Sequence, residues 1–147
     1  MATLILTTHS ILRYLILAML IWSLVTAWSG WKGDKAYGRS TRIVHQTTRI
    51  LLIVQMLLGI GLYYLLGFYR LVGKLNRLGD QSIFFTVVHV SMMLLAIILI
   101  NLGYGLAMKA RTDKRKYRRI AVFYSIGTFI IFMAIPWPFM HSWGTWL

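Results

Sequence analysis

Hydrophobic residues in this chain form four long runs separated by three short polar connections. The runs cover about residues 4–28, 43–66, 83–108 and 120–140. A helix needs roughly 20 residues to cross about 30 Å of hydrocarbon, so each run is long enough to span a membrane. The pattern predicts four membrane-spanning helices within a single transmembrane domain, residues 1–147.

The three connections differ in positive charge. Residues 29–42 and 109–119 carry four and seven Lys or Arg, whereas residues 67–82 carry three. By the positive-inside rule, the first and third connections face the cytoplasm and both termini lie on the outer, periplasmic side. Short connections favour an all-α, up-down-up-down four-helix bundle. The first run has no basic segment before it and no evident cleavage site, so we interpret it as a retained span rather than a signal peptide.

Composition narrows the classes of chemistry. The 147 residues are 59% hydrophobic, include no Cys and carry a net charge of +13. Without Cys there is no disulfide, thiolate metal site or c-type haem attachment. The cations lie between apolar runs, so we expect contact with a lipid bilayer and not with nucleic acid. The acids Asp34, Asp80 and Asp113 all lie in connections, which disfavours transport through a buried carboxylate. No Ser or Cys is set beside both a base and an orienting acid, which disfavours hydrolase or transferase chemistry.

Two histidines inside the runs mark the candidate site. His9 lies a few residues into the first run and His89 a few residues into the third, and both runs begin on the expected outer side. The first and third helices of an up-down bundle are diagonal neighbours, so their facing side chains meet in the core. An imidazole on each flank suits a haem, and we therefore predict His9 and His89 as axial ligands of a haem b iron. The alternative is that each histidine only hydrogen-bonds a neighbouring helix.

Three further residues share the expected depth of this site. Arg13 lies one turn after His9, about 6 Å along the axis and on nearly the same face. Its guanidinium suits a haem propionate or a quinone carbonyl, or alternatively extends to the membrane surface. Gly59 and Gly61 lie near the outer end of the second run and would give a macrocycle space, although small residues also serve ordinary helix packing.

The remaining histidines are weaker candidates. His141 follows Pro136 and Pro138, which end the fourth helix, and would be an interfacial residue or a third partner at the outer site. His45 and Arg49 repeat the His-x-x-x-Arg spacing at the cytoplasmic end of the second run. No second histidine shares that depth, so a bis-histidine haem is not expected there. A quinone or propionate site at this end competes with the simpler interpretation of polar residues at headgroup level.

The segments HSILRYL, IVHQTTRILLIVQMLLGIGLYY and TVVHVSMM give the chain a resemblance to the small four-helix b-type cytochromes of bacterial cytoplasmic membranes. The likeness rests on a His near the start of the first span and a Q-x-x-x-G run in the second. It implies a non-covalent haem b, respiratory electron transfer and a multi-pass location in the bacterial inner membrane. The chain is more distantly similar to the four-helix family of a copper-resistance membrane protein and a small protoporphyrinogen oxidase, whose activity is not carried over.

Together these observations predict a membrane-bound cytochrome with one haem, which exchanges electrons with the quinone pool or with a respiratory-complex subunit. One alternative is a haem-free accessory subunit of a larger membrane complex, in which the basic third connection contacts lipid or a partner. Another is a haem-dependent oxidoreductase acting on a porphyrin or a quinol. A homo-oligomer is compatible with the sequence.

Overall fold

The computed structural model describes residues 1–140, 142 and 144. The long helices are α1 (Ala2–Lys32), α2 (Arg39–Leu65), α4 (His89–Met108) and α5 (Asp113–Ala134). Between α2 and α4 lie the 3₁₀ helix η1 (Phe68–Arg77), the short helix α3 (Asp80–Ile83) and the π-helical turn η2 (Phe84–Val88). The described chain is all-helical, as predicted.

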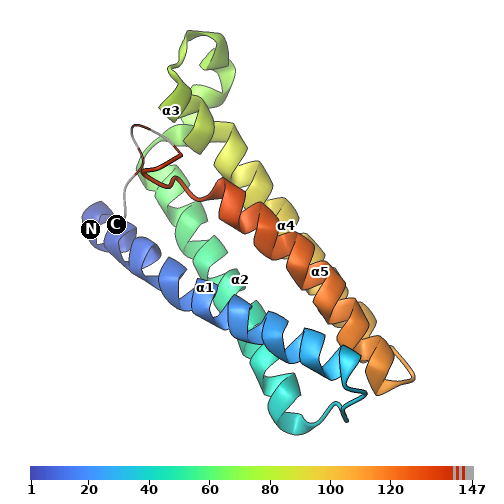
Figure 1. The fold of residues 1–147 in the computed structure, drawn as a ribbon. Helices are drawn as coiled ribbons and strands as arrows, with labels where there is room; N and C mark the ends of the chain where they lie inside the picture. Colours follow the sequence, from blue (N-terminus) through green and yellow to red (C-terminus); the bar gives the residue numbers. More distant parts are fainter. Residues whose placement is uncertain (141, 143, 145–147) are drawn as a thin grey trace.

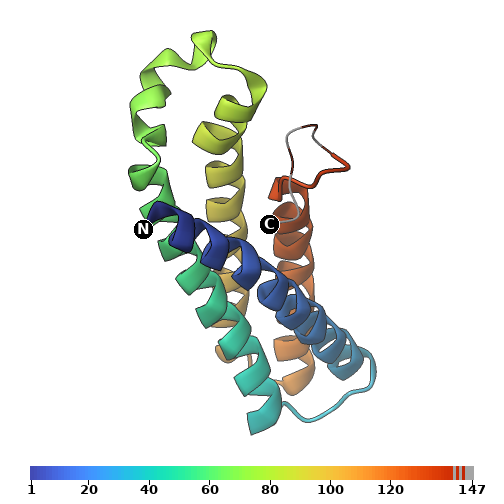
Figure 2. The same cartoon turned by 90° about the vertical axis from the view of Figure 1, so that its left-hand side faces the viewer.

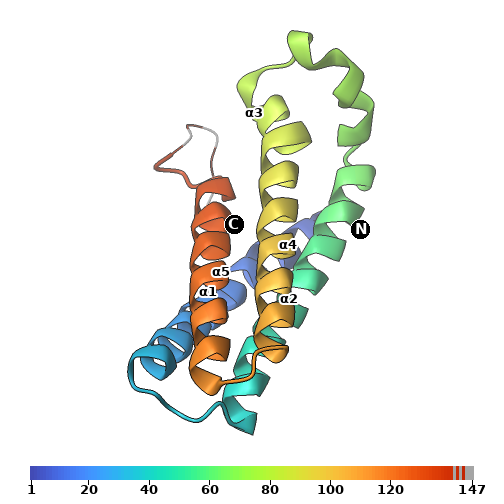
Figure 3. The same cartoon turned by 90° about the vertical axis from the view of Figure 1, so that its right-hand side faces the viewer.

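The long helices form an up-down-up-down bundle. The start of α1, the end of α5 and η1 lie at one end of the molecule, which we call the terminal end (Figure 1). The two connections 33–38 and 109–112 lie at the opposite end, which we call the loop end. Helix α1 packs against α2 and α5, and α4 packs against the same two helices, so α1 and α4 are diagonal neighbours as predicted. Figures 2 and 3 show α1 strongly inclined to α4 and α5.

Four helical stretches are long and apolar enough to cross a membrane: Ala2–Lys32, Arg39–Leu65, Asp80–Met108 and Asp113–Ala134. The third comprises α3, η2 and α4. Many large apolar side chains on the outside of the bundle are exposed, including Val25, Leu57 and Phe129 at 62%, 60% and 66%. Apolar surface of this extent needs a lipid environment, so the fold is that of a multi-pass membrane protein.

Small residues bring α4 and α5 together. A Cβ at Gly103 would overlap Phe123, and a Cβ at Gly127 would overlap Ile100. Side-chain packing and close backbone approach hold helices together in lipid, where the hydrophobic effect between helices is absent. The fully buried Leu20, Ile100 and Ile120 belong to the core that forms around this contact.

Two prolines determine how α5 ends. The fourth run was expected to continue to about residue 140, but α5 ends at Ala134 and Ile135 is extended, with ψ 132°. Pro136 disfavours a helical conformation in the residue before it. Pro136 also has no N–H for the carbonyl of Phe132, four residues earlier, and the indole Nε1–H of Trp137 donates to that oxygen at 2.9 Å.

Candidate functional site at the terminal end

His9 lies on the first turns of α1 and its ring packs against α2. A Cβ at Gly59 would stand 3.3 Å from His9 Cε1, so only a residue without a side chain gives the ring its present room. Gln55, one turn before Gly59, donates from Nε2 to the backbone oxygen of His9 at 2.8 Å. The Gln55 to Gly59 segment therefore positions His9. Within the described residues, the buried His9 Nδ1 has no hydrogen-bond partner.

His89 begins α4 and is oriented by α5. Its Nδ1 lies 2.8 Å from the carbonyl oxygen of Ala134. That oxygen would pair with the N–H of residue 138 in a continuing helix, but residue 138 is Pro and has no N–H. Because a carbonyl only accepts, His89 Nδ1 carries the proton and donates it. The neutral ring then presents the lone pair of Nε2, as a metal-binding histidine does when a backbone acceptor fixes its tautomer.

Aromatic rings surround His89 on its own segment. The centroids of Phe84 and Phe85, both in η2, lie 5.9 Å from the imidazole centroid. Tyr63 on α2 donates its hydroxyl proton to the backbone oxygen of Thr86 at 3.3 Å. A π-helical turn widens the hydrogen-bonding pattern of a helix and is often found beside functional residues. Here it brings two aromatic rings to the imidazole from the turn that precedes it.

The two histidines and Arg13 lie at the same end of the bundle. His89 contacts the end of α5 through Ala134. The Arg13 guanidinium carbon lies 5.7 Å from the ring centroid of Trp137, just after α5. The fold therefore brings the residues predicted from α1 and α4 to the same end of the bundle, with Gly59 against one ring. Gly61 is not part of this contact, because a Cβ there would meet no atom within 4 Å.

Arg13 lies among aromatic groups. Its Nη2 donates to the hydroxyl of Tyr14 at 3.2 Å. Its guanidinium carbon lies 4.9 Å from the Tyr14 ring centroid and 5.7 Å from that of Trp137, which follows α5. A planar cation over aromatic faces is a favourable arrangement. Its predicted role toward a propionate or a quinone stays a prediction.

His45 and Arg49 belong to the loop end, far along α2 from Gly59. His45 is fully buried, and its Nδ1 lies 2.6 Å from Ser23 Oγ on α1. Tyr37 stacks on the imidazole with 5.9 Å between ring centroids. The Arg49 guanidinium lies 4.5 Å from the Tyr104 ring centroid. These contacts pack both residues between helices, and the second site for a quinone or a propionate suggested by the sequence here stays a prediction.

Several of these partners were not expected from the sequence, namely Ser23, Tyr63 and Ala134. Of the three, only Ala134 leaves a sequence signal, because a proline four residues later leaves a helical carbonyl without its donor. His141 lies outside the described residues. Within the described part of the chain, no group of three or more His, Cys, Asp or Glu side chains is placed to hold a metal ion.

The fold and the positions of His9 and His89 define a class of protein, the helical membrane bundles with a histidine pair at one end. Comparisons with protein-family models, with curated proteins and with solved structures found no match.

Proposed function

We propose that the protein is a membrane-bound b-type cytochrome, in which His9 and His89 hold one haem near the terminal end. The observation that carries the proposal is the orientation of His89. Its Nδ1–H is engaged by Ala134, so Nε2 is available to a metal, and the second imidazole stands on the diagonal helix at the same end of the bundle. Two neutral imidazoles from facing helices are a common haem ligand set.

The surroundings suit a flat, largely apolar cofactor. Phe84 and Phe85 offer aromatic surface, and Gly59 leaves room for the His9 ring against α2. Arg13 is the nearby cation that would neutralise a propionate. Haem, when bound, supplies a one-electron redox step, while the residues of this chain hold it, set the local charge and limit water access. The electron partner we propose is the quinone pool or a respiratory partner in the same bacterial inner membrane.

The test is the reduced-minus-oxidised visible spectrum of detergent-purified protein expressed with ample haem. We expect a b-type spectrum that is lost in His9→Gln and in His89→Gln. His45→Gln is the matched control, because it removes an imidazole of equal size from the loop end and should keep the spectrum. A colourless wild-type protein would refute the proposal and favour the haem-free accessory subunit. A spectrum retained in either ligand variant would refute the bis-histidine assignment.

A further inference from the structure

A recess of about 420 Å³ opens at the loop end of the bundle, away from the histidine pair. It is bounded by the 33–38 connection, the start of α2, the end of α4 and the first turn of α5. Its lining residues are Tyr37, Gly38, Arg39, Arg42, Met108 and Lys116. Three of these six carry a positive charge, and no lining residue is acidic.

Of the three cations that line the recess, Lys116 is paired with a described carboxylate, that of Asp113, whereas Arg39 and Arg42 are not. Residues 29–42 and 109–119 together hold eleven cations and two acids, a net charge of +9. Asp34 already pairs with Lys114, and Asp113 with Lys116, each at 2.8 Å. Arg39 and Arg42 make no ion pair with any described residue, and both are exposed. These two guanidinium groups are therefore available to pair with an anion from outside the chain.

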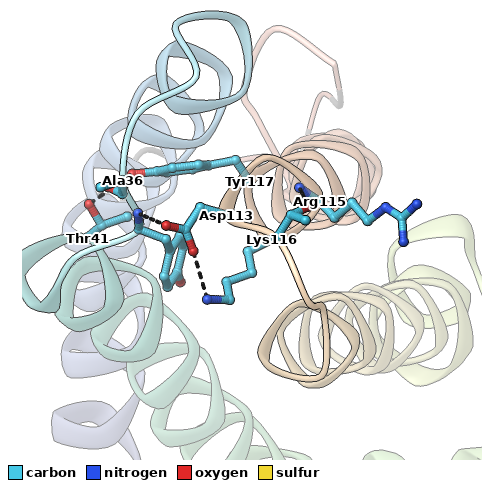
Figure 4. A network of polar contacts seen from close by, with 8 residues as sticks. Ala36, Thr41, Asp113, Arg115, Lys116 and Tyr117 are labelled. Carbon is cyan, nitrogen blue, oxygen red and sulfur yellow. Dashed lines mark hydrogen bonds and ion pairs between the residues drawn. The ribbon is translucent and has the colours of Figure 1, made fainter.

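The recess has a fixed rather than a loose wall. The backbone N–H of Tyr37 donates to Asp113 Oδ2 at 3.1 Å. The hydroxyl of Tyr117 donates to the backbone oxygen of Ala36 at 3.1 Å and lies 3.3 Å from Thr41 Oγ1. Figure 4 shows this network joining the connection to the first turn of α5. Arg39 and Arg42, which bracket Thr41, are therefore held at defined positions beside the recess.

Tyr37 provides the inner wall. Its ring stacks on the buried His45 and meets Tyr117 edge to face at 5.0 Å between centroids. Burial, together with Tyr104 and Tyr117, raises the pKa of the Tyr37 hydroxyl, so the phenol stays neutral. An anion in the recess thus faces cations and neutral groups, while the nearby Asp113 carboxylate is already engaged by Lys116 and by the backbone N–H of Tyr37. The backbone N–H groups at the start of α2 add to this, because Gly38 provides no side-chain cap there.

We propose that this recess binds the phosphate group of an anionic membrane lipid. Guanidinium groups pair with phosphate through two parallel hydrogen bonds, which suits the unpaired Arg39 and Arg42. The recess opens where α2 begins and α4 ends, which is the level of lipid headgroups for helices that span a membrane. Met108 and the Tyr37 ring give the lipid backbone an apolar surface to lie against. The proposal is independent of haem binding.

The test is a lipid titration followed by native mass spectrometry of the full chain, with phosphatidylglycerol and with phosphatidylcholine. We expect a one-to-one adduct with phosphatidylglycerol that survives an excess of phosphatidylcholine. Arg39→Gln/Arg42→Gln should weaken that adduct by roughly tenfold. The matched control is Lys35→Gln/Arg111→Gln, which removes the same charge from exposed positions at the same end outside the recess, and it should bind as the wild type does.

Equal binding by the wild type and the recess variant would overturn the proposal. Equal weakening in the recess variant and the control would also overturn it, because the adduct would then reflect net charge alone. A separate arm adds inorganic phosphate to the phosphatidylglycerol complex. If phosphate alone displaces phosphatidylglycerol at similar concentrations, the occupant is a soluble phosphate compound and the lipid assignment is wrong. If the double variant does not fold, Arg42→Gln is compared with Lys35→Gln by the same measurement, with the same two outcomes.

Discussion

His89 Nδ1 lies 2.8 Å from the carbonyl oxygen of Ala134, and this contact joins the start of α4 to the end of α5. Neither residue determines the contact by itself. Pro138 removes the N–H that would otherwise reach the Ala134 oxygen, and Pro136 turns the chain away one residue after the helix. At the terminal end of the bundle, the His89 side chain therefore supplies the hydrogen-bond donor that Pro138 lacks.

This relationship predicts different stabilities for the two histidine variants in the haem-free protein. His89→Leu leaves the Ala134 carbonyl without a donor, so we expect the free energy of unfolding to fall by about 1–3 kcal/mol. His9→Leu removes a ring whose Nδ1 has no partner, so a smaller loss is expected. Unfolding in detergent by SDS titration measures both, and an equal loss would contradict the proposed donor role of His89.

Gly59 and Gly61 offer a matched test of the proposed haem site. A Cβ at Gly59 would stand 3.3 Å from the His9 ring, so Gly59→Ala should displace the ring and reduce haem retention several-fold. Gly61→Ala meets no neighbouring atom and should retain haem as the wild type does. The measurement is the ratio of haem to protein absorbance after size-exclusion chromatography. Equal retention in both variants would show that haem does not require the present position of the His9 ring.

Ser23 and His45 form a buried hydrogen bond between α1 and α2. Ser23→Ala leaves the imidazole Nδ1 without a partner in a fully buried position, which should cost about 1–3 kcal/mol of unfolding free energy. Thr26→Ala is the control on the same helix, because Thr26 only bonds the backbone oxygen of Trp22 and should change stability by about 0.5 kcal/mol or less. Thermal unfolding monitored by circular dichroism compares the two. Comparable losses would indicate that the Ser23 contact is not specific.

Gly103 and Gly105 test how α4 meets α5. Gly103→Ala should destabilise the bundle by about 1–3 kcal/mol, because the added methyl group would overlap Phe123. Gly105→Ala has open space and gains helix propensity, so it should be neutral or stabilising by up to about 1 kcal/mol. The same unfolding assay applies. A stable Gly103→Ala protein would require Phe123 to repack without cost.

The fold class followed from the sequence because membrane helices are set by run length and hydropathy, which a single chain displays directly. The placement of His9 and His89 at one end followed from the alternating direction of the helices. The contact of Gly59 with His9 agrees with the common depth expected for these two residues. No finding tests haem ligation itself, which stays a proposal.

Rotational placement could not be predicted in the same way. Helix α4 is hydrophobic all round, so its sequence does not show which face meets α5. The Ser23 to His45 bond depends on the angle at which α1 crosses α2, and no local pattern specifies that angle. Likewise, the pairing of Tyr117 with Ala36 joins residues far apart in sequence. Such contacts follow from packing, which only the three-dimensional structure displays.

The π-helical turn at Phe84–Val88 also changes how the third span is to be counted. A turn of this kind holds about one residue more than an α-helical turn, so the positions before and after it follow two different helical registers. Deleting one residue there would restore a single register and rotate His89 relative to α3 by about 100°. The composition and hydropathy of the span would hardly change, yet the His89 imidazole would no longer point toward the Ala134 carbonyl oxygen. In this span the number of residues, as well as their types, thus sets the direction of the His89 side chain.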